Sequence, residues 1–202
     1  MNATSPFLRF PPFTGRRLTG IATGLFAVLM LTSPAQAGFH LWTLREVYTD
    51  VSGSLQFIEM VDNSGGQNFV GGHTITVQNI GATQTHTFTV PSNVSSSAGN
   101  ALLFGTAGVQ AAGGPVPNFI IPNNFLFAAG GTISFFGANS GAYAALPTDG
   151  SLSRTWTGGN AVNSPQNLAG QTGTIVVPEP ATWTLLGAGL TCLTFVMRRR
   201  TR

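Results

Sequence analysis

Four carboxylates occur within seventeen residues early in the chain, and their types and spacing match two kinds of site. Glu46 and Glu59 fall in two successive runs that we expect to pair as strands. Two carboxylates that face each other in this way can hydrolyse a glycosidic bond. Asp50 and Asp62 follow those runs and, together with Asn63 and backbone carbonyls, offer the oxygen ligands that calcium prefers. The pattern therefore suggests a hydrolytic pair and a calcium site as hypotheses.

The commoner roles of these carboxylates are structural. Adjacent antiparallel strands place the turns at Asp50 and Asp62 at opposite ends of the pair, and no D-x-D-x-D-G loop is present. A glutamate on a strand usually meets solvent or forms a hydrogen bond to a nearby loop. We therefore predict no catalytic residue and no metal site.

The histidines and large aromatic residues also favour structural roles. His40, His73 and His86 lie 33 and 13 residues apart, without a cysteine or close carboxylate, so we expect surface or half-buried strand positions. Four aromatic side chains could form a sugar-stacking platform, but a fold without disulfides needs large apolar anchors in its core or rim. These four are Trp42, Tyr48, Tyr143 and Trp156.

Motifs of nucleophilic and nucleotide chemistry are absent from the sequence. Serines are many, but no G-x-S-x-G occurs. The pairs Gly71-Gly72 and Gly113-Gly114 precede neither a lysine nor an expected helix, so they are not phosphate loops. We predict that the protein is not an enzyme and needs no cofactor.

Residues 1–37 have the parts of a secretory signal peptide: a basic start, an uncharged run over 18–31 and a small-x-small cleavage site. The pair Arg16-Arg17 also begins twin-arginine signals, but the residues after it do not complete that pattern, so we favour an ordinary signal peptide. The residues that carry the basic start and the cleavage site are Arg9, Arg16, Arg17, Ala35, Ala37 and Gly38, the last of which would begin the exported chain.

Residues 178–202 combine a proline-containing tripeptide, an uncharged run over 181–197 and a basic cluster. As a helix, the seventeen residues of the run would span roughly 25 Å, at the short end of what crosses a bilayer. The basic cluster would hold its end in the cytoplasm by the positive-inside rule. The tripeptide is Pro178, Glu179 and Pro180, and the cluster is Arg198, Arg199, Arg200 and Arg202.

This segment resembles the PEP-CTERM sorting signal of Gram-negative bacteria, because the tripeptide, the apolar helix and the basic residues follow in that order. The resemblance implies an exosortase as partner, transient anchoring in the inner membrane and cleavage near the tripeptide. The body would then reach the cell surface or the exterior.

The charge distribution excludes nucleic acid as a partner. The net charge of +3 arises from the two ends, since residues 1–37 and 178–202 each carry +3 and residues 38–177 carry −3. The body has no lysine and only Arg45 and Arg154, so it cannot neutralise a row of phosphates. The single cysteine, Cys192, lies in the expected helix, so the body has no disulfide.

Residues 38–177 predict one all-β domain of eight to ten strands, because short β-type runs are broken by glycine and proline without a sustained helical period. The alternating runs 73–80 and 83–90 predict a hairpin. We expect a helical turn over 123–129 and a loop over 157–172. The other expected strands are 40–49, 54–61, 101–106, 119–122 at an edge, 132–136, 142–146, 152–156 and 173–177.

The body also resembles the lamin-tail-like domain, an immunoglobulin-like fold of some secreted bacterial proteins. The pieces that carry the resemblance are residues 46–50, 57–60, 102–104, 131–136, Ser164-Pro165 and Asn167. It implies an antiparallel β-sandwich and assigns no catalytic residue.

Together these features predict an exported, exosortase-sorted protein with a non-enzymatic structural or adhesive β-sandwich, in contact with exopolysaccharide. The sequence leaves a carbohydrate- or calcium-binding module and a secreted hydrolase as alternatives.

Overall fold

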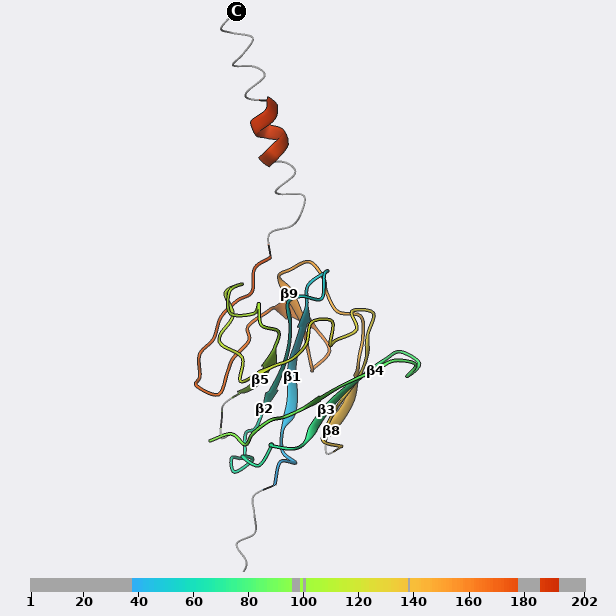
Figure 1. The fold of residues 1–202 in the computed structure, drawn as a ribbon, viewed down its shortest axis with the longest axis vertical. Coiled ribbons are helices and arrows are strands. Elements are labelled where there is room, and N and C mark those ends of the chain that lie inside the picture. Colours follow the sequence, from blue (N-terminus) through green and yellow to red (C-terminus); the bar gives the residue numbers. More distant parts are fainter. Residues whose placement is uncertain (1–37, 96–98, 100, 138, 178–185, 193–202) are drawn as a thin grey trace, which may run out of the picture. The chain divides into compact units, whose positions relative to one another are not determined.

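The computed structural model of the protein describes residues 38–95, 99, 101–137, 139–177 and 186–192 (Figure 1). Up to residue 177 the described residues form strands and turns but no helix, which confirms the all-β prediction. The strands are β1 (Thr43–Thr49), β2 (Gln56–Val61), β3 (Thr74–Asn79), β4 (Thr85–Thr89), β5 (Ala101–Gly105), β6 (Phe119–Ile120), β7 (Gly131–Phe135), β8 (Asn139–Tyr143), β9 (Leu152–Thr155) and β10 (Asn160–Val162).

The strands form two sheets. A six-stranded sheet has the order β10-β9-β1-β2-β5-β6, and a four-stranded sheet has the order β4-β3-β7-β8. The predicted hairpin is confirmed, because β3 and β4 pair antiparallel in a continuous register from Thr74 opposite Thr89 to Gln78 opposite Thr85. Glycine at 81 and a left-handed Ala82 close its turn.

The main core lies between the inner faces of the two sheets. Each strand alternates its side chains between two faces, so one alternate set of apolar residues points inward. Each fully buried leucine, isoleucine or phenylalanine contributes about 1.5–3 kcal/mol relative to an exposed position. The two sheets supply Leu44, Val47, Ile58, Met60, Leu102 and Phe104 from one side and Ile75, Val77, Ile133, Phe135 and Tyr143 from the other.

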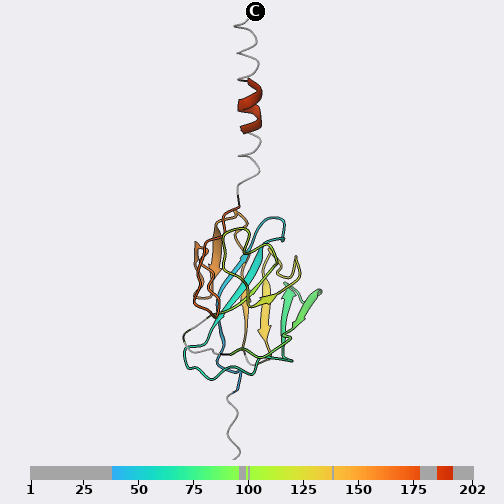
Figure 2. The same cartoon turned by 60° about the vertical axis from the view of Figure 1, so that its left-hand side comes forward.

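A second apolar cluster covers the outer face of the six-stranded sheet. Tyr48, Phe57 and Leu103 point outward and pack with Val109 and Ile175, all five being fully buried. Ile175 belongs to residues 163–177, which we call the strap. Figure 2 shows this orange-to-red segment on one side of the blue strands β1 and β2, with the green and yellow strands of the four-stranded sheet on the other.

The expectation of a purely antiparallel sandwich is wrong at one edge. Strand β6 pairs parallel to β5, with Phe119 opposite Phe104. The connection between these strands runs from residue 106 to residue 118, long enough to return the chain to the same end before it pairs again. The prediction that residues near 119–122 form an edge strand is confirmed.

Three further local predictions are wrong. Residues 123–129 form turns and no helix, with Asn124 in the left-handed region at φ 58°. The expected loop 157–172 contains β10, which pairs with β9. Residues 173–177 form no strand, because side chains hold them instead of a ladder.

The predicted signal peptide over 1–37 lies outside the described residues, as do most of the tripeptide-to-arginine segment and both ends of the expected helix over 181–197. Residues 186–192 are helical. Within the part of the chain that the structure describes, no helix is both long and apolar enough to cross a membrane.

Candidate functional site: a buried carboxylate pair beneath the strap

Glu46 and Glu59 are direct neighbours across β1 and β2. They are register partners on the outer face of the six-stranded sheet, and their exposed fractions are 5% and 0%. The hypothesis that these two carboxylates meet across a strand pair is therefore confirmed. Of the two roles expected for a strand glutamate, a solvent-exposed position is wrong here and a hydrogen bond to a loop is confirmed, because the strap covers and binds both side chains.

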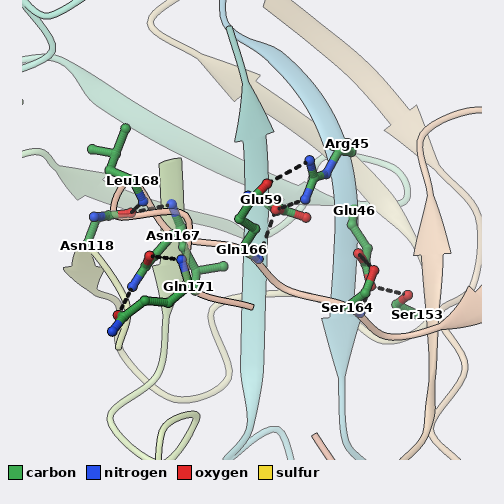
Figure 3. A network of polar contacts seen from close by, with 11 residues as sticks. Arg45, Glu46, Glu59, Asn118, Ser153, Ser164, Gln166, Asn167, Leu168 and Gln171 are labelled. Atoms are coloured by element: carbon green, nitrogen blue, oxygen red, sulfur yellow. Dashed lines mark hydrogen bonds and ion pairs between the residues drawn. The ribbon is translucent and has the colours of Figure 1, made fainter. Parts of the chain in front are cut away.

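Glu59 binds an arginine and the strap at once. Its Oε1 forms an ion pair with Arg45 and accepts a hydrogen bond from the backbone N–H of Gln166 at 2.9 Å (Figure 3). The same guanidinium donates from Nη1 to Oε1 of Gln166 at 3.2 Å. A β-bulge between Leu44 and Glu46 disturbs the register at Arg45, the residue that takes part in this network.

Glu46 binds the next part of the strap. Its Oε1 accepts the backbone N–H of Ser164 at 2.9 Å, and its Oε2 accepts the Ser164 hydroxyl at 3.2 Å. The hydroxyl of Ser153, on the neighbouring strand β9, also donates to Oε1. The two glutamates thus bind strap residues two positions apart, and Figure 3 shows the strap crossing both strands.

The electrostatics of Glu59 are dominated by burial. Loss of solvent raises the pKa of this carboxyl to about 7, although Arg45 opposes the rise, and the nearby Glu46 carboxylate adds to it. Its second oxygen, Oε2, is buried without a hydrogen-bond partner among the described residues. A carboxyl in this setting takes up a proton near neutral pH, which removes the cost of an uncompensated buried charge.

Two buried asparagines close the strap onto itself and onto its neighbours. Asn163 donates from Nδ2 to the carbonyls of Ser151 at 2.7 Å and Ile175 at 2.8 Å, and its Oδ1 accepts the Ile175 N–H at 2.6 Å. Asn167 donates to the carbonyl of Val116 at 3.0 Å. Its Oδ1 accepts the backbone N–H of Gln171 at 3.0 Å. These side chains satisfy backbone groups that a β-ladder would otherwise satisfy.

The end of the strap is also attached to the body. Val176 donates its N–H to the carbonyl of Ala112, and Val177 donates to that of Gly150, at 3.2 and 3.3 Å. Gly173 lies against the 113–114 backbone, where an added Cβ would come within 2.3 Å of a carbonyl oxygen. Only glycine permits this approach.

This arrangement uses the carboxylates for attachment. Ser164 and Gln166 occupy the positions at which a substrate and a hydrolytic water would have to reach Glu46 and Glu59. A pair that acts on a glycoside must have its carboxyls open to the sugar on both sides of the bond. In the described conformation the pair therefore anchors a chain segment.

The calcium hypothesis for Asp50, Asp62 and Asn63 is wrong. Antiparallel pairing places the two aspartates at opposite ends of β1 and β2. Each carboxylate serves its own turn, since Asp50 accepts the Leu55 N–H at 3.0 Å and Asp62 accepts the Ser64 N–H at 2.9 Å. No group of three His, Cys, Asp or Glu side chains that could hold a metal occurs among the described residues.

The aromatic side chains pack in the core or at its rim, as predicted, and the histidines lie at surface or half-buried positions. Trp42 and Tyr48 are fully buried and Tyr143 is 5% exposed, so they cannot form a sugar-stacking platform. Trp156 packs half-buried against the main core. His40 is exposed, whereas His73 and His86 are half-buried.

The sequence pattern indicated the two glutamates but not the residues that bind them, Ser153, Ser164 and Gln166. It also gave no sign that Asn163 and Asn167 would hold the strap through backbone groups. The one available signal was the density of Asn, Ser and Gln over 160–171, which exceeds what a plain connection needs.

Comparison with known proteins gives one match. Residues 176–200 match the family of the PEP-CTERM protein-sorting motif, which includes Pro178, Glu179, Pro180 and Arg198 to Arg200, while Arg202 lies beyond it. No curated protein and no solved structure matches the chain significantly. The resemblance of the body to a lamin-tail-like domain stays a prediction. From residue 176 onward, directly where the strap ends, this chain carries a PEP-CTERM protein-sorting motif.

Proposed function

We propose that the protein is an exosortase substrate whose β-sandwich acts at the cell surface or in the extracellular matrix as a non-enzymatic structural or adhesive domain. The observation that carries the proposal is the join between body and motif. The strap is fixed through Val177, and the sorting motif begins at residue 176.

The motif implies export and processing by an exosortase at a membrane. The proposal adds that the predicted helix over 181–197 anchors the chain transiently in the inner membrane. Cleavage near Pro178-Glu179-Pro180 would then release the body to the exterior.

The strap supports release of an intact domain. Every contact of the strap given above joins residues within 38–177, so a cut after Val177 breaks none of them. A folded domain that keeps Ile175, its last fully buried apolar residue, and Val177, which packs against the outer cluster, does not expose that cluster after processing.

The use of the carboxylates supports a non-enzymatic role. The sequence suggested Glu46 and Glu59 as a hydrolytic pair, but these carboxylates bind Ser164 and Gln166 of the strap. A domain whose polar side chains are used for internal attachment suits a structural or adhesive part.

The experiment is fractionation of producing cells with three forms of the full chain. The first is unchanged, the second has Pro178-Glu179-Pro180 replaced by three alanines, and the third ends at Val177. We expect the unchanged chain at the surface or in the medium, the alanine variant in the inner membrane at full length, and the short form released without surface retention.

The matched control replaces Ser151, an exposed body residue, by alanine and should behave as the unchanged chain. Identical distribution of all forms would contradict sorting by this segment. A body purified from the exterior that cleaves a glycan or peptide would contradict the non-enzymatic role.

A further inference from the structure

The outer face of the four-stranded sheet is a continuous surface of hydroxyl and amide side chains, which we call the hydroxyl face. In β3, β4 and β7 the apolar residues point inward, which leaves the alternate polar residues on this outer side, and β8 adds Ser140 and the small residue Ala142. The face consists of Thr74, Thr76, Gln78, Thr85, Thr87, Thr89, Thr132, Ser134 and Ser140.

The strand register sets these side chains in rows. One row crosses all four strands, because Thr87 pairs with Thr76, Thr76 with Ser134, and Ser134 with Ser140. The next row runs from Thr85 through Gln78 to Thr132 and ends at Ala142 on β8. Neighbours within a row are about 4.8 Å apart, and rows repeat about every 7 Å along the strands.

The hydroxyl face carries no charge. None of β3, β4, β7 and β8 contains Asp, Glu, Lys or Arg. Protein surfaces usually mix charges over about a quarter or more of their residues, and exposed edge strands such as β4 usually carry a lysine against unwanted pairing. The body as a whole has few charges, with no lysine and only Arg45 and Arg154 as cations, and the hydroxyl face is a fully uncharged part of it.

The hydroxyls of this face are available to a ligand. Thr85, Thr87, Thr89, Thr132 and Ser140 are exposed. The one side-chain hydrogen bond on the face among the described residues joins Gln78 Nε2 to Thr85 Oγ1, at a long 3.3 Å. A ligand can therefore bind most of these hydroxyls without breaking an internal side-chain hydrogen bond.

We propose that the hydroxyl face binds a neutral polysaccharide. Each threonine or serine hydroxyl donates one hydrogen bond and accepts two, which is also the capacity of a sugar hydroxyl. The absence of charge on both partners avoids the desolvation of ions, which is the main cost of polar association. The threonine methyl groups add apolar contact for the carbon-bound hydrogens of a sugar ring.

Other partners suit the face less well. A protein partner needs a central patch of aromatic or aliphatic side chains, and the face has none. A nucleic acid or an acidic polysaccharide needs cations, which the four strands lack. A regular array of hydroxyls can bind several sugar units of one polymer at once. Each weak contact raises the effective concentration for the next, so the overall affinity increases.

The inference rests on the proposed function, which brings the face to the cell exterior.

The test is affinity electrophoresis of the exported protein in native gels that contain dextran, hydroxyethyl cellulose, galactomannan or yeast mannan. We expect retardation by at least one of these neutral polymers. Replacement of Thr76 and Thr87 by valine should raise its dissociation constant about tenfold, because two hydrogen bonds are lost. Valine keeps the branched side chain that strands favour, so the fold persists.

The matched control replaces Thr157 and Thr174, exposed threonines outside the four-stranded sheet, by valine and should bind as the unchanged protein. Two charged variants separate neutral from ionic binding. Thr87→Lys and Thr87→Glu should both weaken retardation by the neutral polymer.

Retardation by none of the four polymers would overturn the proposal, and so would equal retardation of the Thr76/Thr87 variant and the control. Binding to alginate that Thr87→Lys strengthens and Thr87→Glu abolishes would replace the neutral ligand by an acidic one. None of these results bears on where the protein is delivered, because cell fractionation tests that separately.

Discussion

Glu46 and Glu59 lie opposite each other on β1 and β2, and each accepts a backbone N–H from the strap, from Ser164 and Gln166 respectively. One carboxylate pair thereby attaches a segment more than a hundred residues away in the sequence.

Arg45→Ala should lower the free energy of unfolding by about 2 kcal/mol, because it leaves the buried Glu59 carboxyl without its counter-charge. The loss is smaller than for a fully buried pair, since 39% of the Arg45 side chain is exposed. Urea titration at pH 7.5 measures it. Arg154→Ala is the control, because Arg154 donates to the surface residue Asn160, and it should change stability by less than about 0.5 kcal/mol. Equal losses in both variants would contradict the role of the ion pair.

Stability should fall as the pH rises through the range that Glu59 controls. The raised pKa, from 4.5 to about 7, means that the folded state keeps a proton that the unfolded state has released. Protonated Glu59 thus contributes at most about 3 kcal/mol to the free energy of unfolding. This stabilisation is complete below pH 4.5, declines between pH 4.5 and 7 and is lost above pH 7.

The measurement for Glu59 compares urea titrations of the unchanged protein and Glu59→Gln between pH 4.5 and 8. Other titrating groups contribute equally to both proteins, so they cancel when the two free energies of unfolding are subtracted. The free energy of unfolding of the unchanged protein should fall relative to that of Glu59→Gln as the pH rises. A difference that stays constant over this range would show that Glu59 keeps an ordinary pKa.

Asn163→Ala should loosen the strap. It removes three hydrogen bonds and leaves the buried N–H and C=O of Ile175 unpaired, at a cost of about 3 kcal/mol. Hydrogen exchange should accelerate over residues 163–177 more than in β3 or β7. Asn160→Ala, at an exposed position three residues earlier, should leave strap exchange unchanged. Uniform acceleration over the whole domain would argue against a locally attached strap.

Gly141→Ala should displace Trp156. A Cβ at position 141 would lie 2.1 Å from Cζ2 of the indole, so the ring has to leave its place over β8. We expect a red shift of tryptophan fluorescence and a loss of about 2 kcal/mol. Gly159→Ala is the control, since the nearest atom to its added Cβ is 3.8 Å away. An unchanged spectrum for Gly141→Ala would contradict the packing.

The sequence predicts the fold where alternation is strong. Residues 74–79 and 85–89 alternate strictly around a glycine turn, so the β3–β4 hairpin follows from pattern alone. Strand β10 has only three residues, all exposed, and thus no alternation to detect. The apolar residues Ile175 to Val177 imitate a strand, but side-chain amides hold this segment in place of ladder partners.

The candidate site was predictable only in part. Glu46 and Glu59 lie on consecutive strands joined by a short turn, so their contact could be predicted from the sequence. Their partners Ser164 and Gln166 come from a segment that no periodicity ties to β1 or β2, so contact at that distance in sequence leaves no local signal. The bulge that disturbs the register at Arg45 is likewise invisible in the residue pattern.

The position of Ile175 in the outer cluster bears on the export that we propose. On that proposal, the domain would lack one of its buried apolar residues until the segment directly ahead of the sorting motif had crossed the membrane. Its outer layer would then be completed only after residues 38–174 were across. A chain stalled earlier would present an unfinished outer layer to proteases on the far side.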